Sequence, residues 1–182
     1  MLQTATNQIT GSIPVSGATA GLLTGTTLYV AGSPPGTACG AGTSATSCGT
    51  LNIINTSSLA VTNSSPILIT DGWHNHLELS ADGQLFIGSH TCSNVNISGG
   101  EVRGCLTIYN TTTSAVIVPP YAGDVTGIAP ILGRNIVYVV QNATLYPYDT
   151  TTDQLEVINP ATPLIIVGQP FDVKYVDPPI PN

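Results

Sequence analysis

The stretch from Asp71 to Glu78 holds the densest set of side chains that could do chemistry. It reads Asp-Gly-Trp-His-Asn-His-Leu-Glu and contains Trp73, the single tryptophan of the chain, and two of its three histidines, His74 and His76. Alternate side chains of a strand share a face at about 6.6–6.8 Å, so we expect His74, His76 and Glu78 to line one face. Neighbouring members could share a divalent metal ion, whereas the outer two are too far apart.

The sequence after this stretch predicts a hairpin. Asp82-Gly83 is a strong signal for a two-residue turn. Such a turn sets His76 opposite Ser89, His74 opposite Thr91 and His90 opposite Asn75, so His90 should face away from the other two histidines. We favour the interpretation that the histidines and the tryptophan pack between sheets with their hydrogen bonds satisfied. A metal or polar-ligand site formed by Asp71, Trp73, His74, His76 and Glu78, and a catalytic histidine, are the alternatives; no other cofactor is predicted.

The composition favours an all-β protein. Of 182 residues, 42% are hydrophobic and only 7% are charged, and Thr, Ser, Asn and Gly supply the remaining polarity. The length fits one domain. The net charge of −7, with three basic residues, argues against nucleic acid and anionic membranes as partners. No apolar run is long enough to span a bilayer, and the first residues lack a signal-peptide pattern, so we expect Met1 to begin a trimmed or mature fragment.

The four cysteines form two locally spaced pairs, Cys39 with Cys48 and Cys92 with Cys105. Of the three possible connectivities, the local one is the simplest. Paired cysteines in such a chain indicate an oxidising compartment, and therefore a secreted or cell-surface protein. Four free thiols in a cytosolic protein are the alternative.

The chain also contains an internal repeat. Its marks are a Leu-Tyr-Val type strand followed by a strand that ends in Asn-Thr or Asp-Thr. The order occurs three times: 28–31 then 51–56, 85–88 then 106–111, and 136–139 then 145–150. One strand before and one after each pair predict four antiparallel strands per unit, as in propeller blades. The first two units carry insertions between their second and third strands, which contain all four cysteines.

These segments resemble the YVTN-type β-propeller repeats of bacterial and archaeal surface proteins. The resemblance rests on 4–15, on 28–30 and on Ser-Ala-Asp-Gly-Gln-Leu-Phe-Ile at 80–87. It implies an all-β, β-propeller-like array of four-stranded antiparallel blades: residues 1–16 as the outer strand of a preceding blade, blades at 17–70, 71–122 and 123–168, and the start of a further blade with a Pro-rich tail at 169–182, its strand near 171–176.

Three blades do not close a propeller, so we expect a longer chain or association between copies. We favour a non-catalytic extracellular or cell-surface module for binding or structural assembly, whose partner is a protein, a carbohydrate or copies of itself. The alternative is an enzyme or metal-dependent ligand site at the channel mouth, since some related propellers have lactonase-like activity. A third interpretation keeps the all-β prediction but replaces the propeller with a solenoid or a sandwich.

Overall fold

The computed structural model describes residues 2–3, 5–9, 11–39, 48–93, 95–97, 101–152, 154–155, 164–168, 170 and 172–174. Every regular element in these residues is a β-strand. Three antiparallel sheets of four to five strands contain most of them, which confirms the all-β prediction. No helix in the described part of the chain is long and apolar enough to cross a membrane.

The three sheets share one strand order. The first sheet contains β3 (Ala18–Thr24), β4 (Thr27–Gly32) and β5 (Gly49–Asn55), with β6 (Ala60–Val61) and β7 (Ile67–Ile69) both paired to β5. The second contains β8 (Trp73–Leu79), β9 (Gln84–His90), β12 (Leu106–Asn110) and β13 (Val116–Ile117). The third contains β14 (Val125–Pro130), β15 (Ile136–Gln141) and β16 (Thr144–Asp149), with β17 (Gln154–Leu155) and β18 (Leu164–Ile165) both paired to β16.

Two small hairpins lie outside these sheets. β1 (Leu2–Gln3) pairs with β2 (Gln8–Ile9), so the N-terminal segment predicted as one outer strand contains two short strands that pair with each other. β10 (Val95–Ile97) pairs with β11 (Glu101–Arg103) inside the insertion between β9 and β12. Of the C-terminal strand predicted near 171–176, residues 172–174 are described and have no strand structure; the rest lies outside the described residues.

The two disulfides join the predicted partners. Cys39 is bonded to Cys48 and Cys92 to Cys105, with Cα atoms 5.2 and 5.3 Å apart. Both pairs lie in the connections between the second and third strands, as expected. The second bridge also reaches the core, because Cys105 is 1% exposed and belongs to a core cluster.

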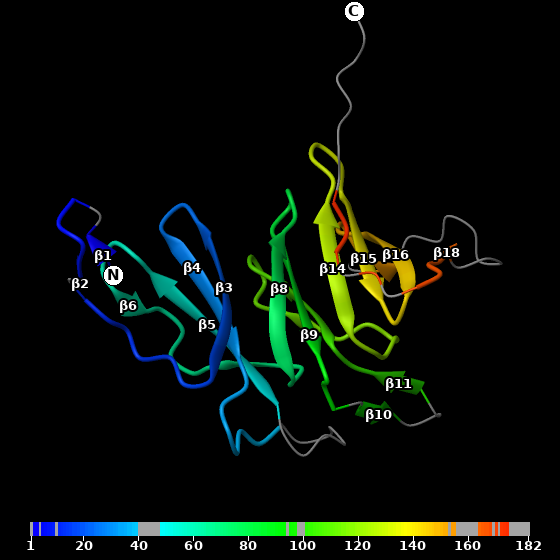
Figure 1. Cartoon of the computed structure of the whole chain (residues 1–182), viewed down its shortest axis with the longest axis horizontal. Coiled ribbons are helices and arrows are strands. Elements are labelled where there is room, and N and C mark those ends of the chain that lie inside the picture. The colour runs from blue at the N-terminus through cyan, green and yellow to red at the C-terminus, as the bar shows by residue number, and fades with distance from the viewer. Residues whose placement is uncertain are drawn as a thin grey trace, which may run out of the picture.

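The sheets stack face to face, with the second between the other two (Figure 1). One core cluster joins Tyr29 and Leu51 of the first sheet to Leu85 and Ile87 of the second. The other cluster joins the second and third sheets, with Phe86, Leu106 and Ile108 on one side and Val125, Val137, Val139 and Tyr148 on the other. Because neighbouring residues of β9 enter different clusters, the second sheet is buried on both faces. The described strands do not close into a ring.

We call the face of each sheet that points along the chain order, from first to third, its forward face, and the opposite one its backward face. Pairing registers place Tyr29, Phe86 and Tyr138 at corresponding forward positions of β4, β9 and β15. The third strands also have a leucine at corresponding forward positions. The registers that pair these strands with β4, β9 and β15 place Leu51, Leu106 and Leu145 there. The forward and backward faces therefore have the same apolar pattern in all three sheets.

The Asn-Thr and Asp-Thr pairs close turns at the ends of the third strands. Asn55 Oδ1 accepts hydrogen bonds from the backbone N–H groups of Ser57 and Ser58 at 2.9 and 3.0 Å. Asn110 Oδ1 does the same for the two threonines that follow it at 112 and 113, at 2.9 Å each. Asp149 accepts from Thr151 N–H at 2.8 Å. A short acceptor side chain is needed at this position because it replaces the carbonyl that would otherwise close the turn.

A candidate polar site on the first strand of the second sheet

The hairpin of β8 and β9 does not have the predicted register. The backbone N–H of Ser80 donates to Gln84 O at 2.9 Å, which closes a loop of three residues rather than two. Leu79 therefore faces Leu85, and His76 faces Gly88 instead of Ser89. Gly83 adopts φ 92°, as the last residue of such a loop requires.

A second irregularity lies at Asn75. The register shifts between His74 and His76, so that His74 pairs with Ser89 and Trp73 with His90. An extra residue in one strand puts the residues on either side of it on opposite faces. The prediction that His74, His76 and Glu78 share a face is therefore wrong. His74 lies on the backward face, whereas His76 and Glu78 lie on the forward face.

His90 is also on the forward face. Gly88 pairs with His76 and so lies on that face, and His90, two residues further along β9, shares it. The prediction that His90 faces away from both other histidines is therefore wrong for His76. Burial lowers the pKa of His76, and the nearby His90 lowers it further.

His74 has a structural role. Its side chain is 0% exposed, and its Nε2–H donates to the carbonyl oxygen of Thr70 at 2.8 Å. Burial lowers the pKa of its imidazole, and the Thr70 hydrogen bond and Asp71 oppose this. A Cβ on Gly49 would come within 2.7 Å of His74 Cε1, so the ring packs directly on the backbone of β5. This position confirms packing between sheets for His74. Its hydrogen bonding is not complete, because the buried Nδ1 has no partner among the described residues.

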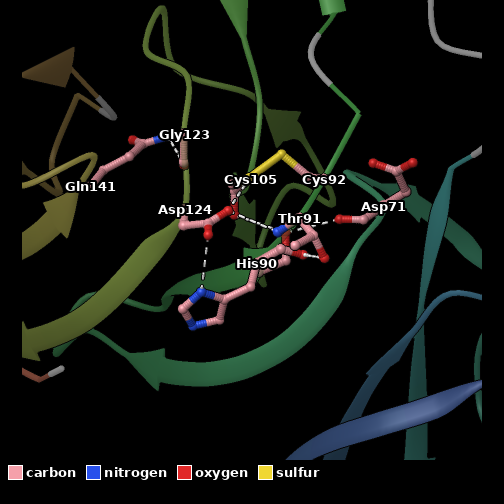
Figure 2. A network of polar contacts seen from close by, with 9 residues as sticks. Asp71, His90, Thr91, Cys92, Cys105, Gly123, Asp124 and Gln141 are labelled. Atoms are coloured by element: carbon pink, nitrogen blue, oxygen red, sulfur yellow. Dashed lines mark hydrogen bonds and ion pairs between the residues drawn. A yellow bond between two sulfur atoms is a disulfide. The ribbon is translucent and has the colours of Figure 1, made fainter. Parts of the chain in front are cut away.

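Asp71 holds the start of the second insertion. Its Oδ1 accepts the backbone N–H of Ser93 at 2.6 Å and its Oδ2 accepts the Ser93 hydroxyl at 2.7 Å. Its backbone carbonyl accepts the Ser89 hydroxyl at 2.8 Å. Asp71 is thus fixed by Ser93, the residue after Cys92 of the disulfide. Figure 2 shows Asp71 near Cys92.

Trp73 does not pack between sheets, because 63% of its surface is exposed. It lies at the start of β8, opposite His90 at the end of β9. The disulfide-bonded insertions leave the sheets at this same end, since each follows a second strand. We call this the loop end; it is at the bottom of Figure 1.

His76 and Glu78 are both half-buried on the forward face of β8, which lies against β14 of the third sheet. Burial lowers the pKa of His76, and burial raises the pKa of Glu78, which Lys174 opposes. Lys174 Nζ pairs with Asp172 at 3.0 Å. The corresponding positions of β3 and β14 hold small or apolar residues, namely Ala20, Leu22, Gly127 and Ala129, so this polar pair is specific to the second sheet.

Sequence reasoning missed Asp124, which joins the loop end to the third sheet. Its Oδ1 accepts the backbone N–H of Thr91 at 2.7 Å, and its Oδ2 lies 3.5 Å from His90 Nδ1. Cys105 Sγ lies 3.9 Å from the same Oδ1 (Figure 2). A single aspartate before a strand has no local signal for this role, because its partners are more than 18 residues away.

Gln141, also missed, donates from Nε2 to Gly104 O at 2.7 Å and lies 3.2 Å from Gly123 O (Figure 2). Together, the predicted residues thus divide into structural anchors, His74 and Asp71, and a group with solvent access, Trp73, His76 and Glu78. Among the described residues, no three His, Cys, Asp or Glu side chains are placed to hold a metal ion.

No family model matches the chain, and no curated protein matches it significantly. The two disulfides indicate an oxidising compartment.

Proposed function

We propose that the protein is a non-catalytic binding and assembly module of a secreted or cell-surface protein, built as a partial β-propeller. The observation that supports it is the loop end. There, the exposed Trp73 lies at the same end of the sheets as the two disulfides. Trp73 is paired with His90 of β9, whose Nδ1 lies 3.5 Å from Asp124. An exposed aromatic ring next to fixed polar groups suits a carbohydrate or protein surface, because it offers stacking area with little entropy to lose.

The single tryptophan makes this proposal easy to test. Because Trp73 is the only tryptophan, its fluorescence reports contact at the loop end alone. We expect one or more members of a panel of neutral and acidic oligosaccharides to change this fluorescence in a saturable way. Immobilised ligand should retain the wild type and the control Leu132→Ala, whose side chain is 86% exposed in another loop, but not Trp73→Ala. Equal retention of Trp73→Ala and wild type would contradict the proposal.

The alternative is an enzyme that uses the His76 and Glu78 pair. It is favoured by their half-buried position and by their opposite pKa shifts, which suit proton transfer. Turnover of a lactone panel that is lost in both His76→Ala and Glu78→Gln would establish this alternative and overturn the non-catalytic proposal. Elemental analysis of the purified protein tests the metal-dependent form of it.

A further inference from the structure

A cavity lies on the backward face of the first sheet. Leu51 of β5 enters the core between the first two sheets, so its neighbours Thr50 and Asn52 point to the opposite, backward face. Leu68 of β7 pairs with Thr50 and shares this face. Together with the chain before β3 and the first insertion, these residues line a cavity of about 380 Å³. None of the lining residues belongs to the second or third sheet.

Contacts within the chain hold the walls of this cavity in place. The backbone N–H of Ser33 donates to Gly17 O at 3.1 Å, and a Cβ on Gly17 would come within 2.6 Å of Pro34 N. Thr37 donates to Pro34 O from its backbone N–H at 3.3 Å and from its hydroxyl at 3.0 Å. Cys48, one end of the first disulfide, donates to Thr37 O at 3.1 Å. A site whose walls are already fixed loses little order when a ligand binds.

The lining combines apolar side chains with neutral polar ones. Much of the apolar part consists of Pro14, Pro34, Pro66 and Leu68. Proline has no side-chain rotamer freedom to lose on binding. None of the described residues that line the cavity is charged. A charged ligand would therefore lose its hydration without gaining a partner of opposite charge, so the cavity favours a neutral ligand.

Thr50 is the residue that indicates a polar ligand. It is 3% exposed, and its hydroxyl oxygen is buried with no hydrogen-bond partner in the described part of the chain. A buried hydroxyl without a partner is costly and uncommon in native proteins. Since Thr50 is one of the residues that line the cavity, a ligand there could supply the missing partner. The half-buried amide of Asn52 lies two residues along the same strand and on the same face.

We propose that this cavity binds a single neutral sugar ring, such as the end residue of a glycan. Sugar hydroxyls both donate and accept hydrogen bonds, as the Thr50 hydroxyl and the Asn52 amide do. The C–H groups of the ring suit the proline walls. The cavity is at the small end of the range of about 300–1,000 Å³ for ligand sites, which favours one ring over a longer chain. This site goes beyond the function proposed above, because it shares no residue with the surface around Trp73.

The test titrates the ¹⁵N-labelled protein with the methyl glycosides of glucose, galactose, mannose and N-acetylglucosamine. At least one should shift the backbone amide signals of Thr50, Asn52 and Leu68 in a saturable way. Thr50→Val should weaken that binding about three- to tenfold, the worth of one hydrogen bond. Its melting temperature should not fall, because a methyl group replaces a hydroxyl that has no partner. A merely structural role for Thr50 would not separate affinity from stability in this way.

Thr19→Val is the matched control. The Thr19 hydroxyl is also buried without a partner among the described residues of the first sheet, but it does not line the cavity. This variant should bind the sugar as the wild type does. Asn52→Leu is the second test variant, and it decides the question if Thr50→Val does not fold. It removes the amide at a half-buried position while keeping a side chain of similar size.

The inference is overturned if no sugar of the panel gives saturable shifts at these amides, or if the wild type, Thr50→Val and Asn52→Leu bind equally well. Trp73→Ala separates this site from the one proposed above, since it should leave binding in the cavity unchanged. Sugar binding that is lost in Trp73→Ala but kept in Thr50→Val and Asn52→Leu would contradict the cavity site and support the loop end instead. Failure here is therefore distinct from failure of the proposed function.

Discussion

Replacing Phe86 with alanine measures how far the structure depends on burying both faces of the second sheet. The phenyl ring is 0% exposed and meets the ring of Tyr148 edge-on, with centroids 5.7 Å apart and planes at 70°. Truncation leaves a cavity in the cluster, and changes of this kind cost about 3–5 kcal/mol. The lost ring contact contributes about 0.5–1.5 kcal/mol of that total. A domain of this size has a stability of roughly 5–15 kcal/mol, so the variant should remain folded but be much weakened.

Tyr138→Ala is the matched comparison, because Tyr138 holds the corresponding position of the third sheet but is only half-buried. We expect it to cost about 1 kcal/mol. Urea unfolding followed by far-UV circular dichroism gives both values, provided the denaturant slope is unchanged. Equal costs for the two variants, or a cost for Phe86→Ala below about 1 kcal/mol, would refute the stacked arrangement of the sheets.

Four further predictions concern single groups. Burial lowers the pKa of His74 below its usual 6.5, so the ring is neutral in the folded protein. The folded protein should therefore lose stability as the pH falls below about 6.5, where the unfolded chain takes up the proton first. In thermal melts, the melting temperature of His74→Gln should fall less with acid than that of wild type. Replacing both Cys92 and Cys105 with alanine should cost about 3 kcal/mol in urea unfolding from loop closure alone, and more in total because Cys105 is in the core. Asn110→Ala should cost about 1 kcal/mol in the same assay, and Asn110→Asp much less, because only the aspartate keeps the turn acceptor. Gly49→Ala should lower the melting temperature markedly, because its Cβ would collide with the Thr70 carbonyl; an unchanged melting temperature would show that β5 can move there.

Local signals explain what the sequence predicted correctly. The apolar strands, the long connections and the cysteine spacing each depend on residues close in the chain, so the three sheets and both disulfides could be predicted. The core also follows, because consecutive residues of β9 are apolar, so that both faces of this strand are apolar. A central strand with two apolar faces needs a sheet on each face.

The candidate site could not be predicted to the same extent, because one extra residue changes which side chains share a face. A plain alternation through Asn75 places His74 with His76, whereas the irregularity at Asn75 separates them. Similar register shifts occur near Thr19 and Thr126, at the corresponding points of β3 and β14. The positions of Asp124 and Lys174 depend on contacts between distant segments, for which a single sequence contains no pattern.

The register shifts in β3, β8 and β14 lie near the loop end, where the chain crosses from one sheet to the next. Their corresponding positions indicate that they have the same structural role. At the first crossing, His74 donates to Thr70 O and Ser89 donates to Asp71 O. At the second crossing, Gln141 donates to Gly104 O and reaches Gly123 O. Each crossing is therefore held by a buried side-chain donor on the backward face of the sheet that follows it.

The two crossings differ in the chemistry of that donor. An imidazole can gain a proton, and in a buried site the charged form is costly, whereas an amide does not titrate in this range. Mild acid should therefore loosen the contact between the first and second sheets before that between the second and third. Hydrogen exchange compared at neutral and mildly acidic pH, corrected for the intrinsic rate, should show protection lost first at β5 and β8, and retained at β12 and β15. Equal loss at both interfaces would mean that His74 does not control the first crossing.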